Sequence, residues 1–207
     1  MFDVDPQITA VRRQVGRRAL DEGDAAVVTI SQAYDTDVDD LWEACTNSER
    51  LARWFAPVSG ELRVGGRYQI EGNAAGTVEQ CDPPKSFSAT WEFAGGVSWI
   101  EVRFSPEPGG GSRFELDHIA HMDEHWAEFG PGAVGLGYDL SLLGLAAYLA
   151  TGDLPHSEQR MAWLASEDAK RFLREAAERW YEADVAGGTS PETARGAADR
   201  CAAAYTA

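Results

Sequence analysis

The sequence of 207 residues is poor in positive charge. It carries 18 Lys and Arg against 34 Asp and Glu, which gives a formal net charge of −16. Because proteins bind nucleic acids and anionic lipid surfaces largely by neutralising phosphates with Lys and Arg, this balance argues against both partners. A local basic cluster stands at 11–18, followed by acidic residues at 21–24. We expect a short amphipathic helix there that pairs with the protein's own acidic surface; the alternative is an acidic partner.

Cysteine is also scarce. Cys45, Cys81 and Cys201 are odd in number, far apart and in no CxxC spacing. This pattern indicates reduced thiols in a cytosolic protein rather than a disulfide framework or a zinc site. The N-terminus lacks an apolar segment followed by a small-residue cleavage site, so we expect no secretion signal and a cytoplasmic location.

Motifs for nucleophilic catalysis and phosphate binding are missing. There is no GxSxG, and Gly109-Gly110-Gly111 predicts a hairpin turn, because no helix follows it as a phosphate-binding loop requires. The spacing of His118, His121 and His125 suggests a metal site. However, residues three apart on a strand point to opposite faces, and His121 and His125 meet only if the turn between them is helical. We therefore expect no metal, no cofactor and no catalytic residue defined by a motif.

What the sequence has instead is one long apolar stretch, from Ala133 to Ala150. Asp139 is its only charged residue. A helix that is apolar on every face is enclosed either by lipid or by the rest of a domain. A length of about 18 residues is the lower limit for a membrane span. The acid lies near the middle and no Lys or Arg cluster flanks the stretch, so we expect a core helix and no membrane partner. Its glycines each cost about 1 kcal/mol relative to Ala, which indicates close backbone approach or a cavity.

Upstream of this helix, the pattern predicts one strand, two short helices and a meander of strands. The β-branched run at 26–34 predicts the strand, and capping residues precede a helix at 38–45. A second short helix carries Leu51, Trp54 and Phe55. From 58 to 122, turn residues separate a series of short strands.

Alternation is clearest in the last two of these strands. Their apolar face carries, in order, Ile100, Val102, Phe104, Phe114, Leu116, His118, Ala120 and Met122. Charged residues dominate the other face, as in an antiparallel sheet with one solvated side. Trp99 and Ile119 break this pattern by lying on the charged face. We expect the C-terminal tail to cover them, in its own chain or in a partner's.

Beyond the apolar helix, Thr151 to Pro155 form a break. Helical spacing recurs through 157–185, and Ser190 with Pro191 predicts the start of an alanine-rich helix. We therefore divide the chain into an N-terminal helical extension (1–25), a central domain (26–150) and a C-terminal helical extension (151–207). The C-terminal helices are a candidate homodimer contact.

Ordered motifs in the central domain resemble those of one known family. They are Val38-x-x-x-Trp42-x-Ala44-x-Thr46, Leu51-x-x-Trp54-Phe55, Gly65-Gly66-x-Tyr68, Gly76-Thr77-Val78, Asp82-Pro83-Pro84-Lys85-x-Phe87, Thr90-Trp91, Leu116-x-His118 and Gly137-x-x-x-x-Leu142-x-x-Leu145. Over about residues 26–150 the chain resembles the START-like SRPBCC superfamily, and within it the homologues of the activator of the ninety-kDa heat-shock protein ATPase. Where this chain has Tyr138 the family usually has Trp, which implies a more polar pocket lining.

The resemblance implies an α+β, helix-grip (START-like) fold. In this fold an antiparallel sheet curls around a long C-terminal helix, to which this chain adds a helical tail. Cavities between sheet and helix in the superfamily hold lipids, polyketides or other apolar molecules, so the expected partner is a small apolar molecule. The candidates for the cavity lining are Trp54, Phe55, Tyr68, Trp91, Val102, Phe114, Leu116, His118, Tyr138 and Leu142.

Three functions fit these residues. The first is binding of a small apolar or amphipathic ligand. The second is a cyclase or aromatase-like enzyme with His118 or Tyr138 as acid or base, and the third is a chaperone-cofactor-like interaction module. His118 is either a core histidine bonded to Tyr138, Asp139 or a backbone group, or a ligand-facing group. Asp139 is either solvated at the sheet's open edge or paired with an arginine of the N-terminal segment or tail.

Overall fold

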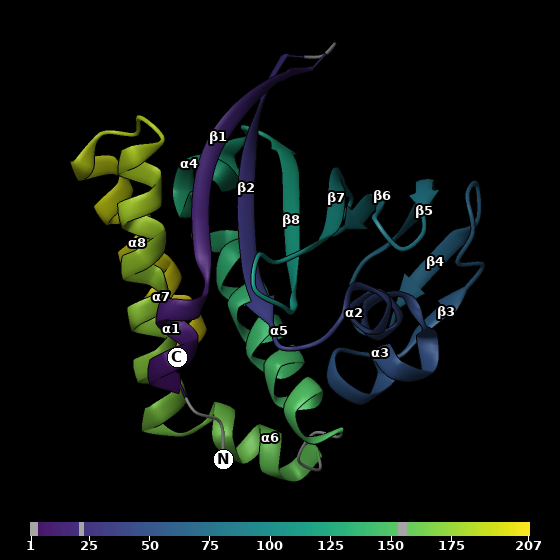
Figure 1. The fold of residues 1–207 in the computed structure, drawn as a ribbon. Helices are drawn as coiled ribbons and strands as arrows, with labels where there is room; N and C mark the ends of the chain where they lie inside the picture. The colour runs from purple at the N-terminus through teal and green to yellow at the C-terminus, as the bar shows by residue number, and fades with distance from the viewer. Residues whose placement is uncertain (1–3, 21–22, 153–156) are drawn as a thin grey trace.

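One antiparallel sheet organises the chain (Figure 1). The computed structural model describes residues 4–20, 23–152 and 157–207. Within them the sheet has eight strands in the order β1-β2-β8-β7-β6-β5-β4-β3. The strands are β1 (Arg12–Leu20), β2 (Gly23–Tyr34), β3 (Val58–Gly60), β4 (Arg67–Ile70), β5 (Ala75–Asp82), β6 (Ser86–Phe93), β7 (Gly96–Pro106) and β8 (Ser112–His121). The helices are α1 (Val4–Ala10), α2 (Val38–Thr46), α3 (Ser48–Trp54), α4 (Glu124–Phe129), α5 (Gly132–Thr151), α6 (Ser157–Leu164), α7 (Glu167–Ala186) and α8 (Pro191–Thr206). This is the helix-grip fold that the motifs predicted.

The N-terminal arginines lie on a strand, not on the helix that we expected. Only Val4–Ala10 is helical; Arg12–Leu20 is β1, which pairs antiparallel with β2 and places Val15 opposite Val28. The alternation of β1 is hard to recognise because its inward positions include Arg13 and Arg17. Pairing with β2 satisfies the backbone hydrogen-bonding groups of this segment. This tertiary contact outweighs the local sequence pattern, from which we expected a helix.

The two short helices after β2 begin at the expected caps. The Asp37 carboxylate accepts from the Asp40 N–H at the start of α2, and the Asn47 side chain accepts from Glu49 and Arg50 at the start of α3. Trp54, at the end of α3, donates its indole N–H to the Ala44 carbonyl of α2 at 2.9 Å. This bond fixes the two helices against each other at one end of the core.

The apolar stretch forms α5, the central helix of the fold. By length and composition it is the one described helix that meets the requirements of a membrane span. In the structure Leu136, Leu142 and Leu145 are buried in the core with the apolar face of the sheet. The helix is therefore a core helix packed against the rest of the domain, as we expected from its sequence.

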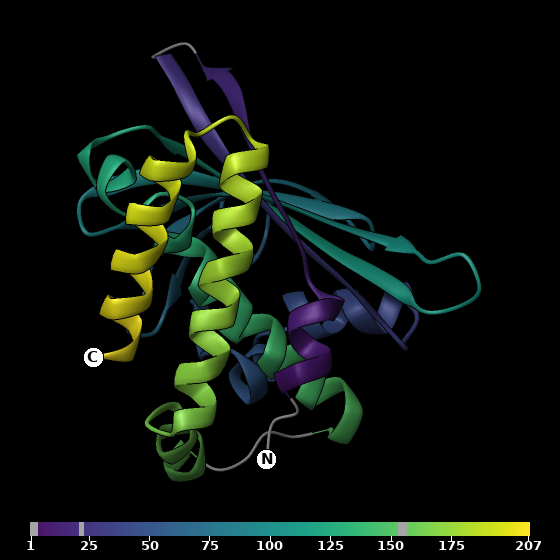
Figure 2. The same ribbon diagram turned by 90° about the vertical axis from the view of Figure 1, so that its left-hand side faces the viewer.

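The C-terminal tail packs on α5 and on β1. Trp180 of α7 lies so close to Gly135 of α5 that a Cβ there would be 2.4 Å from the indole ring, and Gly187 lies similarly close to the backbone of Val15. Figure 2 shows α7 and α8 side by side at this edge of the domain. The glycine at 135 therefore permits the close helix approach that its presence suggested.

Residues 157–207 of the tail do not cover Trp99 and Ile119 of their own chain, so cover by a partner's tail is the part of the expectation that stays a prediction. The tail packs on the inward side of β1, whereas Ile119 faces outward between Val27 and Trp99. Arg18 of β1 reaches across β2 and β8 on that outer side to pair with Glu101 of β7. Neighbouring strands therefore bury Ile119, of which 2% is exposed, without the tail.

Candidate ligand cavity

Two adjoining chambers lie between the sheet and the helices. The first, about 550 Å³ in volume, is lined by both apolar and polar side chains, from β6, β7, β8, α4 and α8 and from one face of α5; because more polar side chains line it than the second, we call it the polar chamber. Its lining includes Ser98, His118, Asp123, His125, Gly137 and Tyr205. The second, about 380 Å³, is the apolar chamber, whose lining includes Leu51, Trp54, Phe87, Val102, Leu116 and Leu142. Each volume is within the range of small-molecule sites.

The predicted cavity residues gather around these chambers. Nine of the ten line the apolar chamber: Trp54, Phe55, Tyr68, Trp91, Val102, Phe114, Leu116, Tyr138 and Leu142. The tenth, His118, lines the polar chamber. Their role in holding a ligand remains a prediction.

The sequence pattern missed the far wall of the polar chamber. Asp123, the N-cap residue of α4, and Trp126 of α4 reach it from one side, and Tyr205 reaches it from α8. The short helix α4 has no buried face whose periodicity would reveal it, and α8 lies beyond the part of the chain that resembles the family. Tyr205 is fixed there by its hydroxyl, which donates to the Ala133 carbonyl at 3.3 Å.

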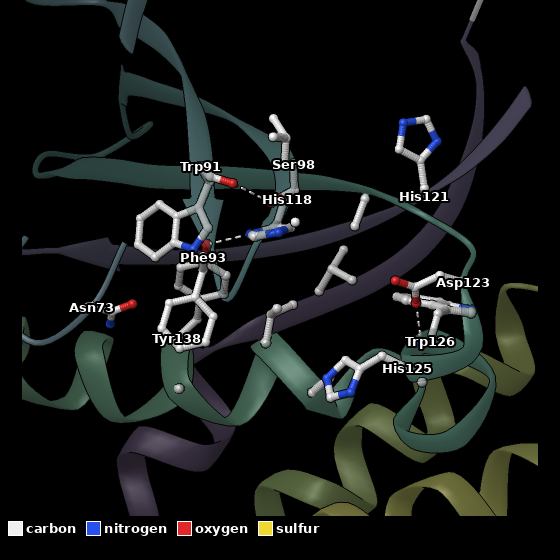
Figure 3. A pocket seen from close by; sticks show the side chains of 18 of the residues that line it. Asn73, Trp91, Phe93, Ser98, His118, His121, Asp123, His125, Trp126 and Tyr138 are labelled. Atoms are coloured by element: carbon white, nitrogen blue, oxygen red, sulfur yellow. Dashed lines mark hydrogen bonds between the residues drawn. The ribbon is translucent and has the colours of Figure 1, made fainter. Parts of the chain in front are cut away.

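His118 and Tyr138 form the central polar contact of the cavity (Figure 3). His118 lies opposite Val28 and Ile100 on the inward face of β8, where 3% of it is exposed. Tyr138 rises from α5, and its hydroxyl is 2.7 Å from His118 Nδ1. This geometry fits the core-histidine alternative for His118, with Tyr138 as its partner.

Burial keeps both members of this pair uncharged. It lowers the pKa of His118 to about 4 and raises the pKa of Tyr138 above its ordinary value. The bond is therefore one between a neutral imidazole and a neutral phenol. Within the described part of the chain, His118 Nε2 has no hydrogen-bond partner. The pair thus offers one unused polar group at the polar chamber.

Aromatic side chains surround the pair. The Trp91 ring meets the His118 ring edge-on, with centroids 6.2 Å apart. Tyr68 donates its hydroxyl to the Thr90 carbonyl at 2.6 Å, so its ring faces the apolar chamber while its polar atom is satisfied within the sheet. Gly76 makes this position possible, because a Cβ there would lie 2.8 Å from the Tyr68 hydroxyl.

Asp139, the neighbour of Tyr138, faces away from the chambers. Its carboxylate pairs with Arg13 of β1 at 2.5 Å and accepts from the Trp180 indole of α7 at 2.8 Å. Of the alternatives for Asp139, pairing with an N-terminal arginine is therefore the observed one. The contact joins the N-terminal strand, the central helix and the tail at one buried point.

The histidines do not converge on a metal. His118 faces inward to Tyr138, whereas the His121 ring packs on Trp99, on the outer face, at 5.6 Å. The His125 ring packs on Phe129. Over residues 4–20, 23–152 and 157–207, no three His, Cys, Asp or Glu side chains come together as a metal site would require.

Comparison with known proteins identifies the family. The model of the family described as "Activator of Hsp90 ATPase homolog 1-like protein" matches residues 35–150. The crystal structure of CalU16 from Micromonospora echinospora is 32% identical, with a TM-score of 0.68, over 84% of this chain and 98% of that one. Its solution structure gives 33% identity and a TM-score of 0.66, over 86% and 97%.

A more distant structure shares the fold. Protein MLL2253 from Mesorhizobium loti is 20% identical over 62% of this chain and 99% of its own, with a TM-score of 0.55. No curated protein matches the chain. The motifs, the helix-grip architecture and the match over more than half of the sequence agree, and the chain belongs to the family of activator of Hsp90 ATPase homolog 1-like proteins.

Proposed function

We propose that this protein binds a small apolar or amphipathic molecule in the chambers between the sheet and α5. The apolar chamber carries the proposal. Its wall is built from the aromatic rings of Trp54, Tyr68 and Phe87 and from aliphatic side chains such as Val102 and Leu142. Removing about 200 Å² of apolar ligand surface from water contributes about 5 kcal/mol before the costs of association.

The pKa shifts of His118 and Tyr138 favour ligand binding over acid–base catalysis. A general acid or base works best when its pKa lies near the working pH. The pKa of His118 is lowered to about 4, and that of Tyr138 is raised above its ordinary value. A cyclase or aromatase-like activity through either residue is therefore the weaker candidate.

An interaction module is also less well supported. The interaction hypothesis rests on the C-terminal helices and on the outer residues Trp99 and Ile119, and Ile119 is buried by its own sheet. Membership of the family does not by itself bring the activity of the protein for which the family is named, since function depends on sites rather than on folds. The chambers remain the feature that needs a functional explanation.

Titration with Nile red, an uncharged apolar dye, tests the binding proposal. Ala89 lies on β6 with its side chain at the apolar chamber, so Ala89→Leu fills space that a ligand needs. We expect saturable binding to the wild type and at least a tenfold weaker affinity for Ala89→Leu. The matched control is Ala33→Leu, at an exposed position of β2, which should bind as the wild type does.

Thermal unfolding of both variants shows whether they are folded. Equal affinity of folded Ala89→Leu and wild type, or no saturable binding to the wild type, would contradict the proposal.

A further inference from the structure

We infer that the occupant is one uncharged amphipathic molecule that spans both chambers, with its apolar body in the apolar chamber and a hydroxyl or carbonyl end at His118. This inference rests on the proposed binding function and specifies its ligand. Three features carry it: the wall that the chambers share, their difference in polarity, and the charges that line them.

The two chambers share a wall. Phe55, Trp91, Tyr138 and Ser141 line both chambers. The Tyr138 ring is held in place at its tip by the bond to His118. Ser141 bonds within its own helix, to the Gly137 carbonyl at 2.9 Å, and so does not hold the wall closed. We therefore expect a ligand that spans both chambers to displace the Tyr138 side chain, a motion that needs no backbone change.

The two chambers suit the two ends of one molecule. In the apolar chamber the Tyr68 hydroxyl is already bound to a sheet carbonyl, which leaves a hydrocarbon surface. In the polar chamber, Ser98 donates to the Trp91 carbonyl and Asp123 caps α4 by accepting from Trp126. His118 also lines this chamber, and its Nε2 makes no hydrogen bond to another described residue. Figure 3 shows its ring between Tyr138 and the open part of this chamber.

The neutral His118 serves either kind of polar end. If Tyr138 donates to Nδ1, then Nε2 carries the proton and donates to a ligand carbonyl or hydroxyl oxygen. In the other tautomer Nε2 accepts from a ligand hydroxyl. Both arrangements satisfy the pair without ionising it.

The charges around the chambers select an uncharged ligand. Among the described residues that line either chamber there is no Lys or Arg, so a carboxylate or phosphate would be desolvated without a countercharge. One carboxylate, Asp123, is among the described residues that line the chambers, and it already accepts from the Trp126 N–H. At His118, the burial that keeps the imidazole neutral also penalises an ammonium group beside it. A neutral polar end avoids both costs.

Three fluorescent probes with the same pyrene body test this selection: 4-(1-pyrenyl)butanol, 4-(1-pyrenyl)butyrate and 4-(1-pyrenyl)butylamine. Each is titrated into the wild-type protein at pH 7. We expect the alcohol to bind at least tenfold more tightly than the carboxylate and the amine. Comparable affinity for all three, or tighter binding of a charged probe, would overturn the inference while leaving the binding function in place. No binding of any probe would overturn both.

The position of the polar end is tested by His118→Leu. We expect this variant to lose about tenfold in affinity for the alcohol and to keep its affinity for 1-butylpyrene, which has no polar end. Tyr34→Phe, which removes a buried hydroxyl away from both chambers, is the control and should leave both affinities unchanged. Equal losses for the alcohol and for 1-butylpyrene in folded His118→Leu would contradict placement of the hydroxyl at His118.

Discussion

The hydroxyl of Tyr138 lies 2.7 Å from Nδ1 of His118, and this contact joins α5 to the centre of the sheet. It is also part of the boundary between an apolar and a polar chamber. The same pair thus contributes to the packing of the fold and to its proposed site. Both roles depend on His118 staying neutral.

Stability should therefore fall in mild acid. The pKa of His118 is lowered from 6.5 to about 4 in the folded protein, so between these values the unfolded chain binds the extra proton. Stability from this group is complete above pH 6.5 and is lost as the pH falls toward 4, by an amount on the order of 3 kcal/mol.

Urea unfolding between pH 4 and 7 measures this loss. His118→Gln should show a flatter dependence on pH than the wild type, whereas His125→Gln, at an exposed position, should keep the wild-type slope. Equal slopes for wild type and His118→Gln would show that His118 does not titrate in this way.

Arg13 should be essential for stability because its partner Asp139 is buried. The two side chains are 3% and 0% exposed. Arg13→Leu leaves an unpaired buried carboxylate and should cost about 3–5 kcal/mol in the free energy of unfolding. The double variant Arg13→Leu/Asp139→Leu should recover most of that loss.

Arg12→Leu is the control for this experiment, because the adjacent Arg12 is exposed on the same strand. Its unfolding free energy should stay within about 0.5 kcal/mol of the wild type. If Arg13→Leu is no more destabilising than Arg12→Leu, the ion pair does not hold β1 to α5.

The contact between the tail and α5 can be tested at Gly135. In Gly135→Ala the new methyl group would lie 2.4 Å from the Trp180 ring, so α7 must shift. Although Ala favours a helix more than Gly does, we expect a net loss of about 1–3 kcal/mol from overpacking. Gly16→Ala, where a Cβ would meet nothing within 4 Å, is the control for chemical denaturation. A Gly135→Ala variant as stable as the wild type would show that the tail is not closely packed on α5.

Much of the central domain was predictable because its signals are local. Caps mark the starts of α2 and α3, and the alternation of β8 places His118 on the apolar face. A polar ring on that face requires a partner, and the family motifs supplied Tyr138 as a candidate. These inferences need only neighbouring residues and the periods of helix and strand.

What was missed depends on contacts between distant segments. Because Arg13 faces inward, β1 lacks the alternation of apolar and polar residues that predicts a strand. The partner of Arg13, Asp139, is 126 positions away in the sequence. The helical period of α7 was visible, but not the surface that it packs on. The polar chamber needs α4 and α8 together, and neither alone signals a cavity wall.

A crystal structure of the protein with 4-(1-pyrenyl)butanol tests the ligand site most directly. We expect the pyrene ring between Val102 and Leu142, and the hydroxyl within hydrogen-bond distance of His118 Nε2. We also expect Tyr138 to move from its position in the shared wall. Probe bound on the outer face of the sheet, or chambers that stay empty at saturating probe, would contradict the claim that this cavity is a ligand site.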